Sequence, residues 1–212
     1  MDETFWHRKW EAKEIGFHRS EVNPLLVKWF GALSLQPASR VFLPLCGKTR
    51  DIAWLLSQGY RVAGAELSEI AVGELFLELG MTPVINDAGR SKHYAGKDID
   101  IFAGNIFDLS ESVPGPIDAV YDRAALVALP EDMRQEYTRH LMQITQNAPQ
   151  LVIVFDYDQN LLTGPPFSIT ASEMNEHYSD VYNLKLLETM DVPGGLKEKC
   201  AAKENVWLLS NT

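Results

Sequence analysis

The sequence predicts a three-layer, doubly wound α/β domain with a seven-stranded, mostly parallel sheet and an antiparallel strand at its C-terminal end. Three observations support this fold class. Short apolar runs alternate with segments of helical periodicity. Most of these runs are almost wholly apolar, as expected of strands that are covered on both faces. No repeat, low-complexity tract or linker divides the 212 residues. We therefore expect residues 1–212 to form a single domain.

Caps and breakers mark the individual elements. Asn23 followed by Pro24 is typical of a helix start, and glycines end the next two helices. Pro130 with two following acids opens a long helix. In chain order we expect a helix from Pro24 to Leu33, a strand at 40–44, a helix at 49–58 before Gly59, a strand at 61–66, a helix from Ser68 to Gly80, strands at 99–103 and 117–121 (the latter after the turn Pro114-Gly115-Pro116), a helix from Pro130, a strand at 150–155, and two final strands at 182–190 and 204–209.

The loops after the first two predicted strands suggest a ligand that contains ribose but no pyrophosphate. Ligands of doubly wound sheets bind at the carboxyl ends of the strands. Loop 43–51 has one glycine, Gly47, so it matches neither a dinucleotide-binding motif nor a P-loop. Glu66 ends the second strand, 19 residues after Gly47, where a carboxylate can accept hydrogen bonds from both ribose hydroxyls. An ordinary strand-to-helix turn is the alternative for the loop.

The next two strand ends extend this candidate site. In Gly104–Leu109, Ile106 and Phe107 can flank an adenine ring, or they can simply pack at a buried strand end. Asp122 and Arg123 stand side by side after the fourth strand. Arg123 can pair with a ligand carboxylate or steady an anionic substrate through its planar guanidinium. A structural ion pair is the alternative.

Aromatic residues concentrate near the N-terminus, where Trp6, Trp10 and Phe17 precede the first predicted helix. We expect residues 1–36 to form a helical lid or cap over the cleft, and a helix packed on the sheet edge is the alternative.

Composition excludes several classes of function. The chain has 19 basic and 29 acidic residues, a formal net charge of −10, which argues against binding to nucleic acid or to an anionic membrane. The densest basic stretch, Lys197 to Lys203, is interrupted by Glu198. The N-terminus has no secretory signal pattern, and no apolar run is long enough to span a bilayer. Two cysteines and five scattered histidines form no metal motif. A cytoplasmic, metal-free monomer is the expectation.

The sequence resembles the bacterial branch of the thiopurine S-methyltransferase family, within the class I S-adenosylmethionine-dependent methyltransferases. Six stretches spread along nearly the whole chain carry the resemblance: Trp6-x-x-x-Trp10, Gly16-Phe17-His18, Val41-Phe42-Leu43-Pro44-Leu45-Cys46-Gly47-Lys48, Gly64-Ala65-Glu66-Leu67-Ser68-Glu69, Asp122-Arg123-Ala124-Ala125-Leu126-Val127-Ala128-Leu129-Pro130, and Gly164-Pro165-Pro166-Phe167. The resemblance implies a Rossmann-like fold, S-adenosyl-L-methionine as cofactor and S-adenosyl-L-homocysteine as product.

The resemblance also assigns roles to individual residues. Arg123 is the candidate catalytic residue, which would polarise or stabilise a thiolate, and Phe17 would face the substrate. The family often has an acid where Asn105 stands, and no residue in 196–203 aligns with the basic residue that some members bring to the substrate, although Lys197 or Lys199 is a candidate. Contacts with the cofactor are implied for Trp10, Leu45, Glu66, Ile106, Phe107 and Arg123.

The implied activity is S-methylation of thiopurines and other aromatic or heterocyclic thiols. Methylation of selenium or tellurium oxyanions, a route of metalloid detoxification, is the alternative within the methyltransferases. Two other classes stay open at this point. One is an NAD-linked oxidoreductase, against which the single-glycine loop counts. The other is a module that binds a nucleoside without catalysis.

Overall fold

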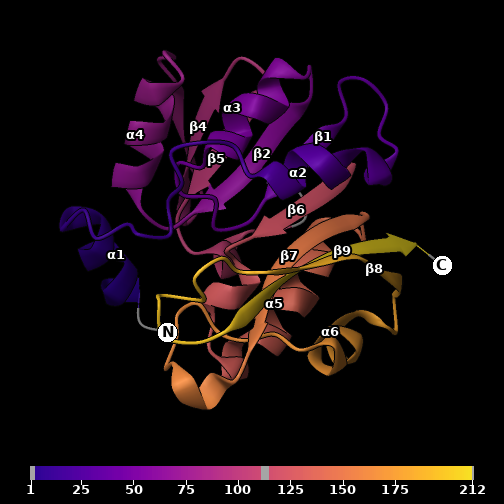
Figure 1. The fold of residues 1–212 in the computed structure, drawn as a ribbon. Helices are drawn as coiled ribbons and strands as arrows, with labels where there is room; N and C mark the ends of the chain where they lie inside the picture. Colours follow the sequence, from indigo (N-terminus) through magenta and orange to yellow (C-terminus); the bar gives the residue numbers. More distant parts are fainter. Residues whose placement is uncertain (1–2, 111–114, 212) are drawn as a thin grey trace.

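A nine-stranded sheet lies between two layers of helices in the computed structural model, which describes residues 3–110 and 115–211 (Figure 1). The strand order is β3-β4-β5-β2-β1-β6-β7-β9-β8. Its five central strands are parallel, and β9 runs antiparallel to both neighbours. The strands are β1 (Arg40–Leu43), β2 (Arg61–Glu66), β3 (Val84–Ala88), β4 (Ser91–Gly96), β5 (Ile99–Ala103), β6 (Ala119–Arg123), β7 (Gln150–Tyr157), β8 (Tyr182–Asp191) and β9 (Ala202–Asn211).

The fold class predicted from the sequence is confirmed, but the sheet has nine strands where seven were predicted. The two additional strands are β3 and β4, an antiparallel hairpin that continues the sheet beyond β5. Four of the five residues of β3 are exposed. A strand with so little burial has no apolar alternation to reveal it, which is why the sequence did not predict this hairpin.

Two layers of helices cover the sheet, and each packs on its own apolar cluster. On one face, Ile52 and Leu75 belong to a cluster with Val41 and Leu43. On the other face, Leu141 and its neighbours pack around Phe42 and Val152. The first layer comprises α2 (Pro24–Trp29), η1 (Phe30–Leu33), α3 (Arg50–Ser57) and α4 (Glu69–Glu78); the second comprises α5 (Glu131–Ile144) and α6 (Ala171–Tyr178).

The helix boundaries agree with the expected caps at Asn23 and Ser68, and Thr49 caps α3 in the same way. The side chains of these three residues accept hydrogen bonds from amides in the first turns of α2, α3 and α4. Gly59 and Gly80 follow α3 and α4 with φ of +83° and +66°, a conformation that favours glycine. The helix predicted to run to Leu33 changes to a 3₁₀ turn at Phe30, and the strand predicted at 117–121 lies two residues later. Of the predicted turn at 114–116, Pro114 lies outside the described residues.

The segment expected to be a lid, residues 1–36, consists of two parts with different surroundings. Leu25, Leu26, Phe30 and Leu33 are buried in the core, so α2 and η1 are a fixed part of the first helical layer. Helix α1 (Glu3–Glu11) lies apart from that layer, beside α4 and the loops that follow the strands (Figure 1). Residues 3–21 lie outside that core cluster, whereas Val22 already packs against it.

Candidate active site

The carboxyl ends of β1, β2 and β5 are joined to one another by backbone hydrogen bonds. The Cys46 amide donates to the Ala65 carbonyl at 2.9 Å, and the Gly104 amide donates to the Glu66 carbonyl at 2.9 Å. Because these strands are parallel neighbours, the loops that follow them form one continuous edge. The β1–β6 pair, at which the chain changes direction in the sheet, is the switch point where ligands of this fold class bind.

Glu66 is the buried carboxylate of this edge. Its Oε2 accepts a hydrogen bond from the Gly47 amide at 2.7 Å, and its Oε1 accepts one from the Ser68 amide at 2.8 Å. Burial raises the pKa of the Glu66 carboxyl, while the amides of Ser68, Gly47 and Leu67 oppose this shift. A carboxylate offers about four acceptor sites. The two amides leave acceptor capacity that hydroxyl donors can use.

The loop after β1 has a constrained backbone. Leu45 adopts φ of +45°, which is uncommon for a residue with a Cβ, and Gly47 adopts φ of +53°. A Cβ at Gly47 would lie 3.1 Å from the indole of Trp10, so this glycine permits close approach of that ring. Lys48 extends away to α4, where its Nζ lies 2.7 Å from Glu78 and 2.9 Å from Glu74. The lysine of the Pro-Leu-Cys-Gly-Lys stretch therefore ties this loop to α4.

The turn after β5 is held from two sides. Asn105 Oδ1 accepts a hydrogen bond from the Phe107 amide at 2.9 Å, and its Nδ2 donates to Glu3 of α1 at 2.7 Å. The Ile106 carbonyl lies 2.8 Å from His140 Nε2 on α5, and the ring of Phe107 lies 5.6 Å from that imidazole. Ile106 is buried, and Phe107 packs partly buried against the same core cluster.

Asp122 and Arg123 have separate partners at the end of β6. Asp122 is fully buried and accepts hydrogen bonds from the Tyr137 hydroxyl at 2.7 Å and from the Leu126 amide at 3.1 Å. Burial raises its pKa to about 6. Arg123 projects toward the N-terminal segment, where its Nη1 lies 3.4 Å from the Phe17 carbonyl. The pair is therefore not an Asp–Arg ion pair.

Aromatic rings of the N-terminal segment gather over this edge. Phe17 lies edge-to-face with both Trp6 and Trp10, at centroid distances of 5.6 Å. Trp10 is 2% exposed, whereas Phe17 is 37% exposed. Together with the Glu3–Asn105 hydrogen bond and an ion pair between Lys13 and Glu74, these contacts connect the segment to the loops after β1, β5 and β6 and to α4.

The loop that contains Gly164-Pro165-Pro166-Phe167, after β7, is also held in place by hydrogen bonds. The Phe167 amide donates to the Val127 carbonyl at 2.6 Å, and the Tyr157 hydroxyl donates to the Pro166 carbonyl at 2.7 Å. Lys197 Nζ donates to the Pro165 carbonyl at 2.8 Å. The basic candidate from the β8–β9 connection is thus bound to this loop.

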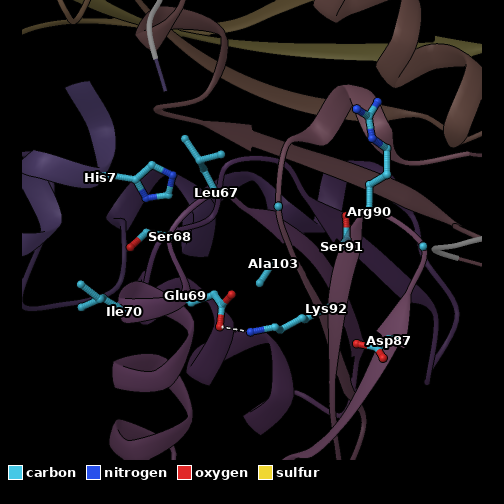
Figure 2. Close-up of a pocket in the computed structure, with 12 residues that line it drawn as sticks. His7, Leu67, Ser68, Glu69, Ile70, Asp87, Arg90, Ser91, Lys92 and Ala103 are labelled. Carbon is cyan, nitrogen blue, oxygen red and sulfur yellow. Dashed lines mark hydrogen bonds and ion pairs between the residues drawn. The ribbon is translucent and has the colours of Figure 1, made fainter. Parts of the chain in front are cut away.

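A cavity of about 450 Å³ lies beside these residues (Figure 2). None of the seven predicted site residues lines it. The sequence assigned no ligand contact to its lining residues, although Gly104 begins the predicted stretch 104–109 and Leu67, Ser68 and Glu69 belong to a family-like stretch. The hairpin that forms one wall has no apolar periodicity, and Leu67 and Ser68 resemble ordinary residues at a helix start. The walls come from α1, the start of α4, the end of β5 and the β3–β4 hairpin: His7, Leu67, Ser68, Glu69, Ile70, Asp87, Gly89, Arg90, Ser91, Lys92, Ala103 and Gly104.

The described residues contain no cluster of three or more His, Cys, Asp or Glu side chains that could hold a metal ion. Among the helices of residues 3–110 and 115–211, none is long and apolar enough to cross a membrane.

Comparison with known sequences gives matches along the whole chain. The family model of thiopurine S-methyltransferases matches residues 1–211. A thiopurine S-methyltransferase of Xanthobacter autotrophicus is 54% identical over 210 residues, which is 99% of each chain. One from Gluconobacter oxydans is 48% identical, over 98% of this chain and 94% of the relative.

Two solved methyltransferases have a similar fold. The 1,6-didemethyltoxoflavin-N1-methyltransferase of Burkholderia thailandensis, solved with S-adenosylhomocysteine, has a TM-score of 0.67 at 16% identity and matches 99% of this chain and 87% of its own. Magnesium protoporphyrin IX methyltransferase from Synechocystis, also with S-adenosylhomocysteine, has a TM-score of 0.65 at 14% identity and matches 99% of this chain and 100% of its own. At these identities the similarity concerns the fold.

Proposed function

Because the chain belongs to the thiopurine S-methyltransferase family and is an S-adenosylmethionine-dependent methyltransferase, we propose that it methylates the sulfur of thiopurines and other aromatic or heterocyclic thiols. One observation carries the proposal: the candidate residues follow the strand order of the sheet. Ile106 and Phe107 follow β5, Glu66 ends β2, Leu45 follows β1, and Arg123 ends β6. Family membership decides against an NAD-linked oxidoreductase and against a binding module without catalysis.

The residues of this edge suit a nucleoside with an amino-acid tail. Glu66 has acceptor capacity left for the two ribose hydroxyls, next to the single-glycine loop after β1. The adenine would lie beside Ile106 and Phe107, and the tail would extend past Leu45 toward Arg123. Trp10 would close the site from above the loop, since its ring already lies on Gly47.

The cofactor supplies an electrophilic methyl group on a sulfonium, and the protein supplies orientation and exclusion of water. A thiolate and a sulfonium neutralise each other during transfer, so apolar surroundings, such as the contacting rings of Trp6, Trp10 and Phe17 would supply, favour the reaction. Aromatic thiols ionise readily, and no strong general base is needed. Arg123 would stabilise the thiolate sulfur through its guanidinium. Asp122 would position Arg123 indirectly, because it fixes the turn that begins at Ala124, a residue with φ of +64°.

The lid is assigned to the segment before Asn23. It spans the strand-end loops through polar contacts, aromatic contacts and one ion pair, whereas α2 and η1 are buried in the core. Release of these contacts would open the site for exchange of cofactor and product.

The experiment is an acceptor screen with radiolabelled cofactor, using purine thiols, aryl thiols, selenite and tellurite. We expect labelled methyl on the thiols. Labelling confined to the oxyanions would instead support the metalloid alternative. At saturating cofactor, Arg123→Ala should lower turnover of an aryl thiol by about tenfold or more, as expected for loss of a charge-stabilising group. Arg139→Ala, at an exposed position of α5, is the matched control. Unchanged turnover in Arg123→Ala would exclude the catalytic role.

We further propose that the protein acts as a cytoplasmic monomer on a small-molecule acceptor and binds neither nucleic acid nor membranes. The net charge of −10 supports the second half of this proposal, because an acidic protein is repelled by both polyanions and anionic lipids.

A further inference from the structure

We propose that the cavity beside α4 is an extension of the cofactor site that accepts a neutral substituent on the edge of the purine. This inference rests on the function proposed above, which places the purine next to the end of β5. Its consequence is that the protein binds cofactor derivatives enlarged at the exocyclic amine of adenine. A volume of about 450 Å³ falls in the ~300–1,000 Å³ range of small-molecule sites.

The position of the cavity continues the order of the site residues along the sheet. Leu67 and Ser68 directly follow Glu66, and Gly104 directly precedes the turn that holds Ile106. From there the cavity extends outward, away from β1, to the β3–β4 hairpin at the edge of the sheet. It thus begins where the ribose and base positions end. A group attached to the outer edge of the purine would point into it.

The size of the cavity is sufficient for a substituent of aryl size. At ~30 Å³ per water in the liquid, about 450 Å³ corresponds to roughly 15 water-sized groups. A benzyl group has fewer non-hydrogen atoms than that. Gly104, with φ of +151°, permits close packing against Ser91 at the bottom of the cavity, because a Cβ there would lie 2.8 Å from Ser91 Oγ.

The chemistry of the walls favours an uncharged group. Figure 2 shows Glu69 and Lys92 joined across the lower rim, with Nζ and Oε2 2.8 Å apart. The Tyr94 hydroxyl also donates to Glu69, at 3.1 Å. Arg90 is paired with Asp108 at 2.9 Å. Glu69, Lys92 and Arg90 therefore have partners and do not call for an ionic ligand. Asp87, on the hairpin side of the cavity, forms no ion pair with the described residues, and its carboxylate disfavours an anionic group.

Apolar and weakly polar surface completes the lining. Leu67, Ile70 and Ala103 supply apolar side chains. The Ser91 side chain is 5% exposed and makes no hydrogen bond to the described residues, which leaves a hydroxyl for a polar atom of the ligand. An alkyl or aryl group on a nitrogen matches this mixture.

The test is isothermal titration calorimetry with S-adenosylhomocysteine and its N6-benzyl derivative. The unmodified protein should bind the two within about fivefold of each other, because the cavity holds the benzyl group. In Lys92→Trp, a bulky ring at a half-exposed position should lower the affinity for the derivative at least about tenfold more than for the parent. Ser91→Phe fills the same cavity from the floor and gives a second, independent measurement.

Asn86→Trp, on an exposed position of β3 outside the cavity, is the control and should leave the ratio of affinities unchanged. The inference is overturned if the unmodified protein binds the parent but binds the derivative more than about fivefold more weakly. An unchanged ratio in both Lys92→Trp and Ser91→Phe overturns it as well. If the parent compound itself does not bind, the proposed function fails instead, so the two failures are distinguishable.

Discussion

At the scale of single residues, Asp122 is a buried carboxylate that connects two elements at the end of β6. It caps the 3₁₀ turn after β6 and accepts the hydroxyl of Tyr137, so α5 and the turn are fixed to each other. The same burial makes its ionisation costly. Burial of the ionised Asp122 carboxylate therefore opposes folding. Its presence here is explained by a role in function or by its hydrogen bond to the turn.

This cost predicts a pH dependence with a definite sign. The folded-state pKa, about 6, lies above the ordinary 3.8, so the folded protein binds the proton more tightly than the unfolded chain does. The Asp122 contribution to the free energy of unfolding should decrease as pH rises from about 4 to 6, by about 3 kcal/mol at ~1.4 kcal/mol per pH unit.

Urea unfolding of the unmodified protein and of Asp122→Asn at several pH values measures this effect as the difference between the two. Asp132→Asn, at an exposed position of α5, is the matched control. A difference that stays constant between pH 4 and 7 would contradict the assignment.

At the scale of elements, α1 is held by aromatic contacts of Trp6 and Trp10 and by polar contacts with the loops beside it. Trp10 is its only buried residue. The hydrogen bond from Asn105 to Glu3 attaches the start of the helix to the turn after β5, while the other end of the Asn105 amide caps that turn. An acid at position 105 would keep the cap and remove the donor to Glu3.

Asn105→Asp should therefore release α1 without disrupting the turn. Two carboxylates would face each other, and we expect faster proteolysis before Asn23 and about threefold to tenfold weaker binding of S-adenosylhomocysteine, equivalent to ~1 kcal/mol. Adding Glu3→Gln to this variant should restore both properties, because the glutamine amide can donate to the new carboxylate. A double variant as impaired as Asn105→Asp would show that position 105 acts on the base alone.

At the scale of the whole molecule, the cofactor site connects both halves of the sheet. Glu66 and Arg123 end β2 and β6, Leu45 follows β1, and Ile106 and Phe107 follow β5. The core clusters on the two faces of the sheet extend to the loops that carry these residues. A ligand bound across these loops stabilises only the folded state. Its binding energy is therefore added to the stability of the entire domain.

Thermal unfolding should report this linkage directly. S-adenosylhomocysteine at 100 times its Kd should add about 2.7 kcal/mol, which for a chain of this size raises Tm by roughly 5–10 °C. NAD should give no shift. Glu66→Ala should lose most of the shift at the same ligand concentration, because the ribose loses its acceptor. A full shift in that variant would remove Glu66 from the ribose position.

Local chemistry explains why much of the fold could be predicted. Apolar runs identify the buried strands, and the cap residues Asn23, Thr49 and Ser68 with Gly59 and Gly80 set the helix ends, since these signals act within a few residues. The β3–β4 hairpin gave no such signal, because it is mostly exposed. Helix α6 does have a cap, Thr170, but only Met174 and Tyr178 are buried in it, so no apolar periodicity identifies the helix.

The sequence by itself determined the order of the elements, the absence of a pyrophosphate loop, and which residues stand at the strand ends. Only the tertiary structure decided what these residues contact. In the folded chain Asp122 and Arg123 have different partners, Lys48 forms ion pairs with α4, and Asn105 donates to Glu3. A hairpin and a helix start together form a cavity. The reason is physical: caps and periodicity depend on neighbours in the chain, whereas ion pairs and cavities depend on side chains far apart in sequence that the sheet order brings together.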